Sequence, residues 1–127
     1  MTVCAIRRRA QPDAPEGVAF IGGPERLDDL IGLSDYLAIT LSLSAETRGL
    51  LDARRLGLMK PSAYLINVAR AEIVEERALY AALAHGRLAG AALDVWYRYP
   101  TATGHALPSS APINELDNVI MTPHVSG

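Results

Sequence analysis

Short apolar runs alternate along the chain with segments in which apolar residues recur at helical spacing. Six short runs are rich in aliphatic residues, a pattern that predicts strands. They cover Val3–Ile6, Val18–Ile21, Tyr36–Leu41, Ala63–Val68, Ala91–Val95 and Asn118–Met121. The run Tyr36–Leu41 is apolar on both faces, which predicts a buried strand of a parallel sheet with helices on each side.

Helices are predicted between these runs. Pro24 suits a first helical turn because its missing N–H would have no partner there, and Leu27–Ile31 then places apolar residues on one face. Two further helices are expected around Ala53–Met59 and Glu75–His85, and Gly86 ends the second of them. The alternation of strands and helices predicts an α/β fold with a parallel sheet and right-handed crossovers.

Polar residues follow several of the predicted strands. The carboxyl ends of parallel strands share one edge, so residues distant in sequence become neighbours there. The residues expected at this edge are Arg7, Ser42, Thr47, Ala69, Arg70, Asp94 and His124. Arginine matches a carboxylate with two parallel hydrogen bonds, and histidine exchanges a proton near neutrality. The pattern favours a site for an anionic substrate and proton transfer.

Three of these residues also have a simpler interpretation. Arg70 fits a solvated position at a helix start, Asp94 a capping group and His124 an ordinary loop residue. His85 in the last turn of a helix complements the helix dipole. Spacing alone leaves both interpretations open.

Composition restricts the function classes. The 127 residues are 50% hydrophobic and 20% charged, which is typical of one globular domain. A net charge of −2 gives no basis for nucleic-acid binding despite the run Arg7–Arg9. The sequence has neither a membrane-length apolar run nor a signal segment after Met1, so we expect a cytoplasmic protein. Cys4, the single cysteine, is expected in the core, and no metal site is predicted.

Several linked motifs carry a family resemblance. The segments "ETRGLL", "LMKPSAYLINVAR", "GRLAGAALDVW" and "NVIMTPHVSG" resemble, in order and spacing, the C-terminal half of the nucleotide-binding domain of D-isomer-specific 2-hydroxyacid dehydrogenases. The resemblance is strong over residues 25–127 and weak over 1–24. It implies one partial NAD(P)-binding domain over residues 1–127 with an incomplete doubly wound, Rossmann-like sheet and without the substrate domain.

The resemblance also implies roles for individual residues. The family transfers a hydride between a nicotinamide cofactor and a 2-keto or 2-hydroxy acid. By this likeness Arg70 grips the substrate carboxylate and carbonyl, His124 is the general acid/base, and Asp94 orients the nicotinamide carboxamide. Further cofactor contacts are implied at Ser42, Thr47, Val68, Ala69 and Gly127.

Two positions depart from the family pattern. Tyr99 lies 29 residues past Arg70, where the family carries a glutamate bound to the histidine. A tyrosine forms a hydrogen bond but is neutral near pH 7, so His124 is expected to be a weaker base than its family counterparts. Ala71 replaces the family's glycine after the arginine, which predicts a different backbone geometry in that turn.

The family's first strand, glycine-rich turn and first helix have no counterpart in this sequence, since Gly22-Gly23 has the wrong spacing and Pro24 follows it. Dinucleotide affinity is expected to fall without that turn. In the strand order 3-2-1-4-5-6 the missing strand lies between Val3–Ile6 and Tyr36–Leu41, which predicts two half-sheets with facing unpaired edges. Three arrangements would account for the missing strand. The N-terminal strand could slide into the vacancy, another chain could fill it, or the chain could be a piece of a larger protein. The third is favoured.

Cofactor choice depends on the residues after Val3–Ile6. NAD-specific members end this strand with an acidic residue that binds the ribose 2′-hydroxyl. Arg7 and Arg8 at this place suit a 2′-phosphate instead, so NADP is somewhat favoured over NAD. The alternative interpretation is a basic turn that only faces solvent. The leading hypothesis is an oxidoreductase fragment. The alternative is a non-catalytic association module that forms a homodimer, as domains of this kind in the family do.

Overall fold

The computed structural model describes residues 1–9, 14–102 and 104–126. Each predicted strand is present, with bounds that differ by a few residues. The strands are β1 (Val3–Ile6), β2 (Val18–Gly22), β3 (Tyr36–Ile39), β4 (Tyr64–Asn67), β5 (Gly90–Leu93) and β6 (Val119–Met121). The α-helices are α1 (Leu27–Leu33), α2 (Ala53–Leu56) and α3 (Glu76–Ala84), and the 3₁₀ turns are η1 (Pro24–Arg26), η2 (Ala71–Ile73) and η3 (Ile113–Glu115).

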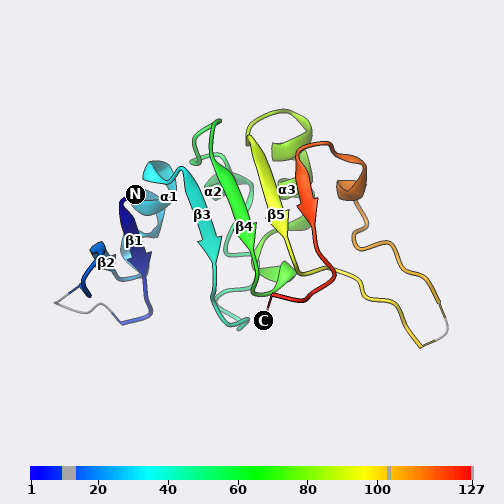
Figure 1. Ribbon diagram of the computed structural model, residues 1–127, viewed down its shortest axis with the longest axis horizontal. Helices are drawn as coiled ribbons and strands as arrows, with labels where there is room; N and C mark the ends of the chain where they lie inside the picture. The colour runs from blue at the N-terminus through cyan, green and yellow to red at the C-terminus, as the bar shows by residue number, and fades with distance from the viewer. Residues whose placement is uncertain (10–13, 103, 127) are drawn as a thin grey trace.

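The strands form two separate parallel sheets (Figure 1). One sheet pairs β1 with β2, and the other has the order β3-β4-β5-β6. This confirms the α/β class and the two half-sheets. Of the three arrangements considered for the vacancy, a slide of the N-terminal strand into it does not occur, because β1 pairs with β2 and no ladder joins β1 to β3 in the described part of the chain.

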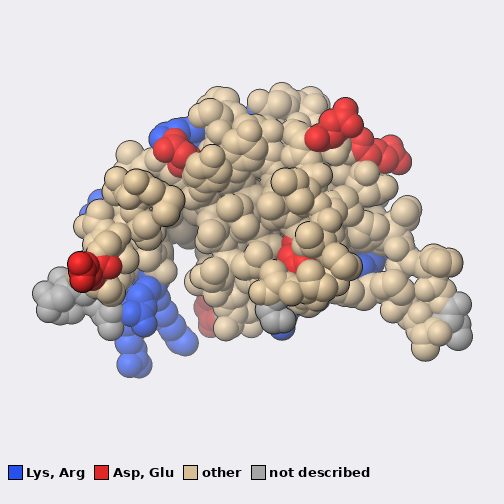
Figure 2. Space-filling model, in the orientation of Figure 1, with Lys and Arg blue, Asp and Glu red and all other residues tan. Residues whose placement is uncertain are grey.

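The facing edges of β1 and β3 can be read from the backbone. The Arg7 amide donates to the Gly22 carbonyl at 2.9 Å, so by strand alternation the Cys4 and Ile6 backbone groups point away from β2. The Tyr64 amide likewise donates to the carbonyl of Asp35 at 2.9 Å. The backbone groups of the next residue, Tyr36, therefore face away from β4, as the alternation predicts. Both half-sheets thus direct backbone donors and acceptors toward the space between them, where Figure 2 shows a notch in the outline.

The core belongs to the second sheet. Leu65 and Ile73 are fully buried, and Leu79 and Leu88 are 1% exposed. Ile31 of α1 joins the same cluster. Burial of such side chains is the main stabilising contribution to the fold.

Two burial predictions are wrong. Tyr36 is 67% exposed, whereas Leu37 and Ile39 on the opposite face of β3 are buried, so one face of this strand is uncovered. Tyr36 stacks instead on Tyr64 of β4 with ring centroids 5.6 Å apart. Cys4 was expected in the core and is exposed, and neither β1 nor β2 contributes a side chain to the buried apolar cluster.

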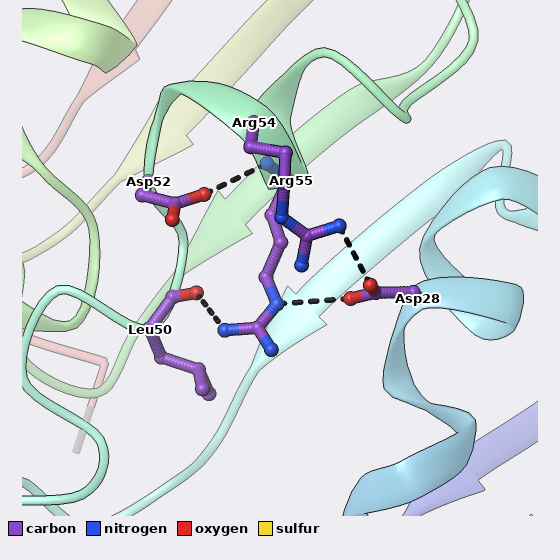
Figure 3. A network of polar contacts seen from close by, with 5 residues as sticks. All are labelled: Asp28, Leu50, Asp52, Arg54 and Arg55. Carbon is purple, nitrogen blue, oxygen red and sulfur yellow. Dashed lines mark hydrogen bonds and ion pairs between the residues drawn. The ribbon is translucent and has the colours of Figure 1, made fainter.

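A polar network joins α1 to α2 and to the segment that precedes α2 (Figure 3). Arg54 and Arg55 both reach the carboxylate of Asp28, at 2.7 and 2.9 Å. Arg55 also donates to the Leu50 carbonyl at 2.9 Å, and the Asp52 side chain caps α2 through the Arg55 amide at 2.8 Å. The hydrogen bonds from the two guanidinium groups lower the pKa of Asp28 to about 2. This network ties the first sheet's helix to the second sheet.

The long segment after β5 is fixed at two points. The Tyr97 hydroxyl donates to the Val74 carbonyl at 2.9 Å, and burial raises the pKa of this phenol well above its ordinary range. Burial raises the pKa of Glu76 in α3, but hydrogen bonds from Ser110 and Ser109 outweigh that effect and lower it. Among the described residues, no helix is long and apolar enough to cross a membrane.

Candidate functional site

The turn after β4 is held by a buried side chain that the sequence analysis did not identify. Asn67 is 2% exposed; its Oδ1 accepts from the Ala69 amide at 3.1 Å, and its Nδ2 donates to the Arg70 carbonyl at 3.0 Å. Arg70 is exposed, and one of its Nη atoms donates to the Ala69 carbonyl at 2.6 Å. Within the described residues Arg70 forms no salt bridge, so its guanidinium suits an incoming anion. Ala71 has no positive φ, so the turn needs no glycine there.

The end of β5 is bonded to the end of β4 and to the segment after β6. The Asp94 amide donates to the Asn67 carbonyl at 3.0 Å, which brings the ends of β4 and β5 together. The Asp94 carboxylate accepts hydrogen bonds from Ser126, from the Thr122 hydroxyl and from the Val125 amide at 3.0 Å. These bonds hold the pKa of Asp94 well below its usual range. Asp94 therefore fixes the segment after β6, and its predicted contact with the nicotinamide stays a prediction.

His124 lies in the segment that Asp94 fixes. Its φ is 60°, a left-handed conformation that is uncommon for a non-glycine residue. Its Nδ1 lies 2.9 Å from the Tyr99 hydroxyl. The Tyr99 oxygen also accepts from the Trp96 amide at 3.1 Å, and the Trp96 indole donates to the Thr122 carbonyl at 3.1 Å. Tyr99 thus takes up a contact with the histidine ring, as a side chain at this position was expected to do.

The hydrogen bonds connect three predicted residues at one edge of the sheet. They run from Arg70 through Asn67 to Asp94, and from there to the residues on either side of His124. Figure 1 shows the red C-terminal segment returning across the ends of β5 and β4. The predicted convergence of these strand ends is therefore present in the fold, while the roles of the residues stay predictions.

The predicted cofactor residues fall into two groups. A cavity of about 470 Å³ lies between the ends of β3 and β4, and it is lined by Thr40, Leu41, Ser42, Leu43, Val68, Ala69 and Arg70. Thr47 does not line this cavity. Its hydroxyl donates to the Ser42 carbonyl at 2.8 Å and accepts from the Ser44 amide at 2.8 Å, so it stabilises the loop that follows β3. Gly127 lies outside the described residues.

The basic residues after β1 lie at the same edge. Arg7, Arg8 and Arg9 are exposed and line a second cavity of about 400 Å³. Figure 2 shows basic side chains gathered below β1. A hydrogen bond from Ser44 is the main reason that the pKa of Glu46 is lowered, and the charge of Arg8 adds to this effect. The charge of Arg8 therefore acts on the loop after β3.

Among the site residues that the sequence analysis missed, only Asn67 has a recognisable sequence pattern. Asn67 is a polar residue in an otherwise apolar run, and such a residue at a strand end is a candidate for a buried structural contact. Trp96 and Thr122 carry no such signal, because their partners become neighbours only in the folded chain. Over residues 1–9, 14–102 and 104–126, no group of three or more His, Cys, Asp or Glu side chains could hold a metal ion.

Comparison with known proteins gives a consistent result. Residues 1–126 match the family model described as D-isomer specific 2-hydroxyacid dehydrogenase, NAD binding domain. A glyoxylate/hydroxypyruvate reductase B from Pectobacterium carotovorum is 44% identical over 99 residues, which are 78% of this chain and 29% of the reductase.

Two solved structures from Xanthobacter autotrophicus Py2, both D-isomer specific 2-hydroxyacid dehydrogenases, superpose with TM-scores of 0.80. One is 40% identical, and the match covers 96% of this chain and 38% of that one. The other, in complex with NADPH and MES, is 33% identical, with 98% of this chain and 58% of that chain covered. The chain thus spans about a third of the length of the reductase, and it belongs to the D-isomer specific 2-hydroxyacid dehydrogenase family, within the NAD binding domain.

Proposed function

We propose that this chain supplies the hydride-transfer edge of an NAD(P)-dependent oxidoreductase that acts on a 2-keto or 2-hydroxy acid. The observation that carries the proposal is the hydrogen-bonded connection from Arg70 through Asp94 to the His124 segment. The exposed Arg70 guanidinium binds the substrate carboxylate as a planar fork. His124 gives a proton to the carbonyl oxygen during reduction and accepts one from the hydroxyl during oxidation.

The nicotinamide cofactor supplies or receives the hydride at the substrate's carbonyl carbon. Ser42, Val68 and Ala69 line a cavity beside Arg70 that fits its nicotinamide end. Arg7 and Arg8 suit the 2′-phosphate of NADP, a choice supported by the NADPH bound to the Xanthobacter relative. The pyrophosphate end has no glycine-rich turn among these 127 residues, so tight binding needs that turn from elsewhere.

The scope of the chain follows from the same observations. We propose that residues 1–127 are part of a nucleotide-binding domain and that a substrate domain outside this sequence closes the cleft. A small 2-keto or 2-hydroxy acid is the expected partner, in a cytoplasmic protein. The second candidate function is homodimeric association without catalysis. The uncovered face at Tyr36 and Tyr64 favours this candidate.

Calorimetric titration of the purified chain with NADPH and with NADH tests the proposal. We expect saturable binding at millimolar affinity or better, with NADPH binding weakened by the double substitution Arg7→Ala/Arg8→Ala and NADH binding little changed. Arg87→Ala is the matched control, since Arg87 is an exposed arginine that precedes β5, at the opposite edge of the sheet. Absence of binding by either nucleotide, together with a defined dimer in light scattering, would favour the association module.

A further inference from the structure

The contact between Tyr99 and His124 has a direction that the neighbouring groups determine. The Tyr99 oxygen and His124 Nδ1 are 2.9 Å apart, close enough for a hydrogen bond in which either atom could donate. The rings lie with their centroids 5.6 Å apart and tilted by 36°. Which atom donates decides which nitrogen of His124 carries the proton when the ring is neutral.

The Trp96 amide supplies the missing information. A backbone N–H can only donate, and this one donates to the Tyr99 oxygen at 3.1 Å. If His124 Nδ1 also donated, the phenol oxygen would accept twice and its own proton would be left to water, because Tyr99 is 47% exposed and no other protein acceptor lies near it in the described part of the chain. If the phenol donates, the Trp96 amide, the Tyr99 hydroxyl and His124 Nδ1 all find their partners within the protein, without a water molecule, and this is the arrangement that the geometry favours.

We propose that Tyr99 is a positioning residue that donates to His124 Nδ1 and thereby holds the neutral imidazole in the form with its proton on Nε2. Two hydrogen bonds, one on each side of His124 along the chain, support this arrangement. Trp96 is tied to the Thr122 carbonyl through its indole at 3.1 Å, and Asp94 accepts from the Val125 amide at 3.0 Å. These bonds fix the backbone around His124, while Tyr99 determines which ring nitrogen of His124 carries the proton.

The consequence for chemistry rests on the proposed function. A carboxylate at this position accepts from Nδ1 and leaves Nε2 bare, ready to act as a base toward a hydroxyl. The Tyr99 hydroxyl reverses this arrangement, because Nε2 then bears a proton and offers a hydrogen bond to a carbonyl oxygen. A neutral imidazole can polarise a carbonyl in this way. Tyr99 thus favours recognition of the 2-keto acid over abstraction of a proton from the 2-hydroxy acid.

Nitrogen-15 NMR of the imidazole rings tests the inference on the chain without substrate or cofactor. Spectra are recorded at about pH 8.5, where an ordinary imidazole is neutral. His124→Gln identifies the His124 signals among those of the three histidines. We expect Nε2 of His124 to carry the proton and Nδ1 to resonate as an unprotonated, hydrogen-bonded nitrogen.

Two variants separate the direction of the bond from its mere presence. Tyr99→Glu should move the proton to Nδ1, and Tyr99→Phe should give a mixture of both forms, whereas Tyr36→Phe, which removes a distant hydroxyl, should change nothing. A proton on Nδ1 in the unsubstituted chain, or a His124 spectrum unchanged in Tyr99→Phe, would overturn the inference. Because this readout needs no catalysis, it stands or fails separately from the proposed oxidoreductase activity.

Discussion

The two sheets of this chain are built from similar apolar strands but differ in what covers them. The second sheet, β3 to β6, packs against a core in which Leu65 and Ile73 are fully buried. In the first sheet Val3 is 38% exposed and Cys4 is exposed, and neither β1 nor β2 contributes a side chain to the buried apolar cluster. An apolar side chain in a strand is therefore buried only where another element covers its face of the sheet, as it does for Leu37 and Ile39 of the edge strand β3.

Different interactions hold the two regions. The second sheet is stabilised by apolar burial, whereas the first is attached through α1, by the buried Ile31 and by the Asp28 network of Figure 3. The Arg26 guanidinium of η1 also lies over the Phe20 ring of β2, 5.1 Å from its centroid. Exposed ion pairs contribute little to stability compared with buried side chains. The second sheet should therefore be the more stable region.

The largest contrast should come from removing apolar side chains. Ile73→Ala leaves a cavity in the core and should lower the free energy of unfolding by about 2–5 kcal/mol. Val3→Ala, on the exposed edge strand, should change it by less than about 0.5 kcal/mol. Urea unfolding followed by circular dichroism measures both. Equal losses in the two variants would mean that the sheets share one core.

Much of this contrast could be predicted from the sequence, and the rest depends on tertiary neighbours. The apolar runs located all the strands, and the missing strand predicted two half-sheets. The same runs misplaced Cys4 and Tyr36, because a strand's composition does not show whether another element lies against it. At the site, the order of strand ends predicted that Arg70 and His124 would converge. The carboxylate bonds of Asp94 could not be predicted, since the order of strand ends does not show which groups beside His124 turn toward this side chain.

Hydrogen exchange should give the next largest difference. The β4 amide of Leu65 lies in a ladder with neighbours on both sides, so it should exchange only on global or near-global unfolding. The outward amides of β1 and β3, at Ile6 and Ala38, should exchange orders of magnitude faster. Exchange measured residue by residue by NMR tests this contrast. Strong protection at Ile6 would show that the edge of β1 is covered in solution.

The smallest expected effect concerns the polar tie between the two regions. The pKa of Asp28 is lowered to about 2 by Arg54 and Arg55. Such a carboxylate stabilises the fold fully above its unfolded pKa of about 3.9, and this contribution is lost as the pH falls toward 2.

Asp28→Asn should therefore lower the melting temperature slightly at pH 6, and the difference from the unsubstituted chain should disappear near pH 2. Asp117→Asn, at an exposed aspartate with no ion pair among the described residues, is the matched control. A difference that persists unchanged down to pH 2 would show that the Asp28 charge does not tie the regions together.

The central claim is that strand ends distant in sequence share one site, and paramagnetic relaxation measures this directly. In a Cys4→Ser background, a nitroxide attached at Arg70→Cys should broaden the amide signals of Val125 and Ser126, while a nitroxide at Arg87→Cys, at the opposite edge, should leave them sharp. Sharp Val125 and Ser126 signals with the label at position 70, or equal broadening from both labels, would contradict the claim.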